Sequence, residues 1–132
     1  EAAAAEFRIV VFHRPPWTRL WDFSAIFPGY NGETWVRNDW VPVIEAGGVD
    51  LVITGHSHSY QRGLRNGTHY LIVGGGGGAL DTVNWPAGSG WPNFSVVQSI
   101  HHYNVMEVDG PVLDWKTYDL NDQLVDSFQI TH

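Results

Sequence analysis

The chain of 132 residues contains no cysteine, so disulfide bonds, thiolate metal sites and cysteine nucleophiles are excluded. Basic residues are also scarce: seven lysines and arginines stand against fourteen acidic residues, which gives a formal net charge of −7. Nucleic-acid phosphates are bound by clustered basic side chains, so we expect no nucleic-acid partner. No apolar run is long enough to span a bilayer, and we expect no membrane partner.

Apolar and aromatic residues, in contrast, are plentiful. They make up 43% of the chain and include seven tryptophans, a composition typical of a globular domain with a core of its own. The chain opens with Glu-Ala-Ala-Ala-Ala-Glu and no methionine, and alanine favours helix. This opening indicates either the end of a helix that begins upstream or an expression scar.

The first half of the chain contains two apolar runs, at residues 7–12 and 49–54, which predict strands buried on both faces. Between them, apolar residues recur at helical spacing over 33–46, and two glycines follow as a stop signal. Pro42 predicts that this helix is kinked or begins near the proline. We therefore expect one strand–helix–strand unit with parallel strands and a right-handed crossover.

The second half has shorter strand-like runs. Residues 70–73 predict a short strand, and residues 79–100, rich in tryptophan, proline and glycine, predict a long loop. An antiparallel meander is expected at the end of the chain, because Asp-Gly and Asn-Asp turns separate three further strands. These three strands are expected at residues 103–108, 112–118 and 124–130.

Histidines follow both apolar runs of the first half. His13 comes directly after the first run, and His56 and His58 follow the second run behind Gly55. Side chains two residues apart in extended backbone point to one side, and parallel strands end at the same edge of a sheet. We therefore expect the three histidines to bind a transition-metal ion. Imidazole suits several such metals, so the ligand type does not choose among them.

These motifs carry a family resemblance. The His-x-Pro-x-aromatic block at residues 13–17 and the Gly-His-x-His-x-Tyr-x-Arg block at 55–62 resemble the last two metal motifs of the calcineurin-like metallophosphoesterases. They are most similar to the purple-acid-phosphatase-like branch. Residues 67–75 resemble the strand and glycine-rich loop that follow in that family. The family's upstream motifs, Asp-x-His, Gly-Asp-x-x and Gly-Asn-His-Asp/Glu, do not occur in this sequence.

The resemblance implies an α/β (α+β) fold, in which residues 1–132 form a single partial domain. This would be the C-terminal half of a β-sandwich flanked by helices. Its expected parts are a strand–helix–strand unit with the histidines at 7–62, a strand with two loops at 63–100, and the meander at 101–132. The implied activity is hydrolysis of a small-molecule phosphoester by two divalent or trivalent metal ions, of which zinc, iron and manganese are the first candidates.

The resemblance also implies how the site residues divide. His13 and His56 would serve one metal ion and His58 the other, while the bridging aspartate belongs to the missing half. No catalytic side chain is identified here, since metal-bound water would be the nucleophile. Tyr60 and Arg62 are candidates for contact with the substrate, and a structural role is equally open for both.

Half a domain leaves a sheet edge and an apolar face uncovered, so we expect the chain to associate. The partner would be a polypeptide carrying the upstream motifs, or another copy of this chain. Two other hypotheses remain open from sequence alone: a stand-alone protein that holds one metal ion, and a non-catalytic metal-binding or β-rich fragment.

Several other residues have ordinary structural interpretations. Asp50 precedes its strand, at the wrong end for the site, whereas Asp81 follows the glycine run and could lie near the metal ions; for both, loop capping is favoured. Four further histidines are taken as structural: His69, His101, His102 and His132. Four tryptophans could flank a substrate cleft or pack in a core: Trp17, Trp21, Trp85 and Trp91.

Overall fold

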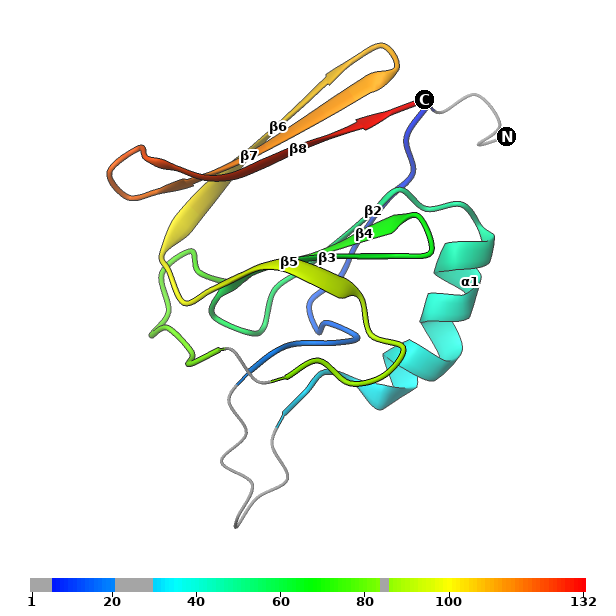
Figure 1. Cartoon of the computed structure of the whole chain (residues 1–132), viewed down its shortest axis with the longest axis horizontal. Helices are drawn as coiled ribbons and strands as arrows, with labels where there is room; N and C mark the ends of the chain where they lie inside the picture. The colour runs from blue at the N-terminus through cyan, green and yellow to red at the C-terminus, as the bar shows by residue number, and fades with distance from the viewer. Residues whose placement is uncertain (1–5, 21–29, 84–85) are drawn as a thin grey trace.

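The computed structural model describes residues 6–20, 30–83 and 86–132. The alanine-rich start at residues 1–5 and the tryptophans at positions 21 and 85 lie outside this part of the chain. Within it, two sheets and one short helical region form a mixed α/β fold, which confirms the expected α+β class (Figure 1).

The larger sheet has five strands in the order β1-β2-β4-β3-β5. β1, β2 and β4 run parallel to one another, while β3 is antiparallel to both of its neighbours, β4 and β5. The parallel pairing of the first two strands confirms the predicted strand–helix–strand unit. The strands are β1 (Ile9–Val11), β2 (Leu51–Thr54), β3 (Tyr60–Arg65), β4 (Thr68–Val73) and β5 (Asn93–Gln98).

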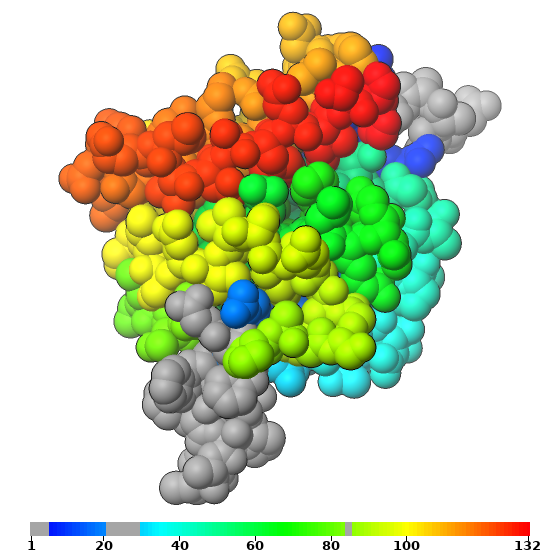
Figure 2. Space-filling view, in the orientation of Figure 1, coloured from blue at the N-terminus to red at the C-terminus, as the bar shows by residue number. Residues whose placement is uncertain are grey.

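The smaller sheet is the expected antiparallel meander, with strands β6 (His102–Asp109), β7 (Val112–Asp119) and β8 (Leu124–Thr131). Its two turns contain Gly110 at φ 52° and Asp122 at φ 60°, left-handed conformations that glycine and aspartate tolerate better than most residues. Figure 2 shows the three strands as one continuous layer along one side of the molecule.

The helical region begins as a π-helix, η1 (Val36–Trp40), and continues as α1 (Val41–Ala46). Pro42 lies directly after η1, where the Val41 N–H bonds to the Val36 carbonyl five residues back, and the proline has no N–H with which to continue the helical bonding. The expected helix is therefore present, and its change of hydrogen-bonding pattern falls next to the proline. Gly48 follows at φ 64°, as a glycine that ends a helix commonly does.

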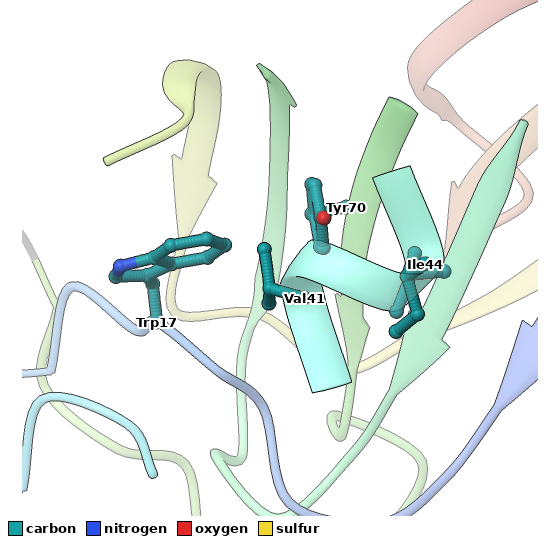
Figure 3. Packing of buried hydrophobic residues seen from close by; sticks show 5 residues of the cluster. Trp17, Val41, Ile44 and Tyr70 are labelled. Atoms are coloured by element: carbon teal, nitrogen blue, oxygen red, sulfur yellow. The ribbon is translucent and has the colours of Figure 1, made fainter. Parts of the chain in front are cut away.

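Two cores lie on opposite faces of the larger sheet. On one face, Trp17, Val41 and Ile44 pack with Val52 and Tyr70 (Figure 3). On the other face, residues of β2 and β4 pack against the meander: Leu51 and Leu71 contact Leu113 and Trp115. Alternation along β2 and β4 supplies both cores, because successive side chains of a strand point to opposite faces. The helix thus covers one face of the sheet and the meander covers the other.

The structure differs from the sequence expectations at three strands. β3 begins within the histidine motif and extends past it, and β5 lies inside the segment predicted to be a loop. The first strand is not buried on both faces, because β1 is at the edge of the sheet and Val11 is 69% exposed. Among the described residues, no helix is long and apolar enough to cross a membrane.

Candidate metal centre

The ends of β1 and β2 bring His13 and His56 together. The N–H of Gly55 donates to the His13 carbonyl at 3.0 Å, which joins the chain just past β1 to the chain just past β2. His56 then adopts φ +64°, and its ring lies edge-on to the ring of His13 with centroids 5.1 Å apart. The Nδ1 atom of His56 is 3.2 Å from the Nε2 atom of His13.

This nitrogen–nitrogen spacing fits two ligands of one metal ion. Two imidazole nitrogens bound at about 2.0–2.1 Å to a tetrahedral zinc ion are about 3.3 Å apart. The same spacing also fits one hydrogen bond between a protonated and an unprotonated ring nitrogen. In either state the two rings already stand close enough to share an ion with little movement.

His58 is placed differently from the other two histidines. Its Nδ1 atom lies 2.7 Å from the carbonyl oxygen of Ala79, and its backbone N–H donates to the Asp81 carboxylate at 2.7 Å. The left-handed conformation of His56 breaks the extended geometry that would turn both rings of the motif to the same side. Within residues 6–20, 30–83 and 86–132, no three histidine, aspartate or glutamate side chains are grouped to hold one ion. The structure therefore offers two imidazoles at one point and a third imidazole at another.

A buried polar network holds the histidine loop in place. The Gln61 side-chain amide donates to the hydroxyls of Thr18 and Ser59, each at 2.9 Å, and its carbonyl oxygen accepts the Arg19 N–H at 2.8 Å. The Ser57 hydroxyl bonds to both Thr18 and Ser59. The side chains in this network are all fully buried: Thr18, Ser57, Ser59 and Gln61. The histidines thus alternate with hydroxyl groups that anchor the loop from behind, a role that the sequence analysis missed.

The glycine run at residues 74–78 packs against this loop instead of forming an open cradle. A side chain at Gly74 would lie 2.0 Å from the Ser57 carbonyl oxygen, and one at Gly78 would lie 2.6 Å from the His58 ring. The Gly74 N–H donates to the Ser59 carbonyl at 3.2 Å. Glycine is required at position 74 because the Ser57 backbone approaches too closely for a Cβ atom, whereas a side chain at position 78 would displace the His58 ring.

An open pocket of about 580 Å³ adjoins His56, and its wall includes Arg14, Tyr30, Glu33 and Trp35. Arg14 and Glu33 form an ion pair at 2.7 Å. This pair lowers the pKa of Glu33, because the carboxylate accepts a hydrogen bond from a cation. Burial, followed by the nearby charges of Arg14 and His13, lowers the pKa of His56. His56 is therefore held in the neutral form that binds metal ions.

The two candidates for substrate contact are engaged elsewhere. The Tyr60 hydroxyl donates to Asp126 at 2.8 Å, and Arg62 donates two hydrogen bonds to the same carboxylate, at 2.6 and 2.9 Å. Asp126 belongs to β8, so these contacts tie the larger sheet to the meander. This geometry favours the structural interpretation that the sequence left open for both residues.

The remaining candidates have structural partners. Asp50 accepts the Arg8 N–H at 2.8 Å and pairs with His132 at 2.9 Å, whereas Asp81 caps the histidine loop as described above. His69 stacks on Phe128, and Trp17 lies in the core with its ring edge-on to Tyr70. Three contacts complete this set: His101 with the Gly75 carbonyl, His102 with the Ile100 carbonyl, and Trp91 with the Arg37 guanidinium.

No family model and no curated protein matches the chain. Among solved structures, it is similar to GAP50, the anchor in the inner membrane complex of Plasmodium, with 18% sequence identity and a TM-score of 0.72. That match covers 96% of this chain and 37% of the GAP50 chain, so the present chain spans little more than a third of that protein. At this identity the likeness shows the fold alone.

Two Vps29 structures give weaker matches. Vps29 from Cryptosporidium parvum is 17% identical at a TM-score of 0.44, over 76% of this chain and 45% of that one. Vps29 from Entamoeba histolytica complexed with Zn²⁺ is 18% identical at a TM-score of 0.42, over 87% of this chain and 60% of that one. Scores this low carry no argument about function.

Proposed function

We propose that this chain is the metal-binding C-terminal half of a calcineurin-like metallophosphoesterase, and that it hydrolyses small-molecule phosphoesters when the other half is present. The observation that carries the proposal is the 3.2 Å separation of the His13 and His56 ring nitrogens at the ends of two parallel strands. This pair comes from the two motifs that resemble the family. It also matches the implied division, in which His58 serves a second ion.

The residues present fit part of the implied metal site. His13 and His56 would hold one ion, and His58 would contribute to another through its Nε2 atom while its Nδ1 atom stays on the Ala79 carbonyl. When bound, such ions supply Lewis-acid activation of water and of the phosphoryl group. The protein's own contribution is to keep His56 neutral and to fix the loop through Gln61. Further ligands, carboxylates above all, would come from outside the described residues.

The experiment is turnover of p-nitrophenyl phosphate and bis-p-nitrophenyl phosphate with added Zn²⁺, Mn²⁺ or Fe²⁺. The chain alone should turn over far below an ordinary enzyme rate of about ten per second. Coexpression with a polypeptide that carries the three upstream motifs should give metal-dependent turnover. His56→Ala should abolish that turnover, and His132→Ala, which removes a histidine on the opposite side of the fold, should not.

Two results would contradict this proposal. A complemented protein with no metal-dependent turnover would make the chain a non-catalytic metal-binding fragment. Turnover near ten per second by the chain alone would show that its own residues complete the site, which is contrary to the dependence on a second half.

A further inference from the structure

The outer edge of β1 is a row of backbone groups that pair with no strand among the described residues. The Arg8 carbonyl accepts the Leu51 N–H at 3.4 Å, and the Phe12 N–H donates to the Ile53 carbonyl at 3.1 Å, so both of these groups face β2. Backbone groups alternate in direction along a strand. Ile9 and Val11 therefore direct their N–H and C=O groups away from β2, and no strand in the described part of the chain pairs with them.

Apolar side chains flank this edge on both faces of the sheet. On the meander side, Val11 is 69% exposed. On the helix side, Val43 is 70% exposed, and an apolar groove of about 250 Å³ runs between Val10 and α1 with Trp40 in its wall. A strand that docks at this edge would therefore bury apolar surface on both faces, as the central strand of a covered sheet does.

Charges of opposite sign lie at the two ends of β1. Asp39 lines the groove at the end nearer Phe12. Arg8 lies at the other end, where its guanidinium donates to the Gly47 carbonyl at 3.1 Å. A two-fold axis perpendicular to the sheet, midway between Val10 of one copy and Val10 of the other, exchanges these ends. It would bring Arg8 of each copy toward Asp39 of the other and keep the helix side against the helix side.

We propose that, when the chain is without the other half that the proposed function requires, β1 pairs antiparallel with β1 of a second copy, about a two-fold axis midway between the two Val10 residues. Ile9 of each copy then lies opposite Val11 of the other, and each of these two pairs exchanges N–H···O bonds. All the outward N–H and C=O groups of β1 are therefore hydrogen-bonded. Val43 of each copy covers Val43 of the other, and the apolar grooves close. The two larger sheets become one continuous sheet. This pairing does not depend on metal binding, since His13 and His56 lie beyond the end of β1 in each copy.

Light scattering and sedimentation across a concentration series are the first test. The chain should be a dimer, and Val43→Lys should weaken dimerisation about tenfold or more, because it places two like charges beside the axis. The matched control is Leu120→Lys. Leu120 is 72% exposed but lies in a turn of the meander, so this change should leave the dimer intact. Circular dichroism checks that both variants are folded.

The second test fixes the register. In this arrangement Val10 faces Val10 across a non-hydrogen-bonded position, with Cα atoms about 4.5 Å apart, which suits a disulfide. The chain has no cysteine of its own, so Val10→Cys should form an interchain disulfide under mild oxidation. Leu120→Cys should not form one. A monomer at every concentration, or a dimer that Val43→Lys leaves unchanged and Val10→Cys does not cross-link, would overturn the proposal. Metal binding can succeed or fail independently of either result.

Discussion

Replacing Gln61 by leucine should release the histidine loop from its support. The side-chain amide of Gln61 makes three buried hydrogen bonds, to Thr18, Ser59 and the Arg19 N–H. Leucine is close in volume but makes none of them. A buried polar group left without its partner costs about 1–3 kcal/mol. The hydroxyls of Thr18 and Ser59 can still bond to Ser57, so the hydrogen bonds that the variant loses without replacement are those to the Arg19 N–H and to one hydroxyl. The free energy of unfolding should therefore fall by about 3 kcal/mol in total.

The assay is the free energy of unfolding by urea. Gln61→Leu should lower it by about 3 kcal/mol, a large part of the roughly 5–15 kcal/mol of a typical domain. Gln123→Leu is the control, because Gln123 lies exposed in a turn and the change should stay within about 0.5 kcal/mol. Equal stability losses in the two variants would refute the conclusion that this network anchors the loop.

Two further predictions concern close packing and pH. Gly74→Ala should destabilise the fold or displace the histidine loop, because the new Cβ would meet the Ser57 carbonyl oxygen at 2.0 Å, whereas Gly76→Ala meets nothing within 4 Å and should be nearly neutral by thermal unfolding. Burial keeps the pKa of His69 below its ordinary value, so as the pH falls through about 6.5 the unfolded chain gains its proton before the folded chain does. The stability that neutral His69 contributes should therefore be complete above that pH and be lost below it. A His69→Phe variant should lose less stability than the parent between pH 7 and pH 5. An equally steep loss in both would contradict this.

The position of the candidate site could be predicted from sequence because it depends on strand ends. Two apolar runs, each followed by histidine, become neighbouring parallel strands, and parallel strands end at the same edge. His13 and His56 meet there for that reason. The place of His58 could not be predicted in the same way. The motif suggested extended backbone, whereas His56 is left-handed and the next histidine turns to the Ala79 carbonyl.

Strand assignments failed where local composition and tertiary pairing disagree. β5 follows a segment rich in tryptophan, proline and glycine, and only its pairing with β3 makes it a strand. β3 contains Gly63, where the register shifts, and a glycine within a short run weakens the strand pattern. The buried network around Gln61 was missed because a glutamine between apolar strands carries no signal of its partners. Its partner Thr18 lies more than forty residues away.

Zn²⁺ binding by calorimetric titration tests the central conclusion most directly, with the parent chain compared against variants that each lack one histidine. The parent should bind zinc, and His13→Ala and His56→Ala should each lose that binding, because both imidazoles of the 3.2 Å pair are needed. His132→Ala should bind like the parent, since its ring pairs with Asp50. Unchanged affinity in both His13→Ala and His56→Ala would show that the two rings form only a hydrogen bond, and would contradict the metal centre.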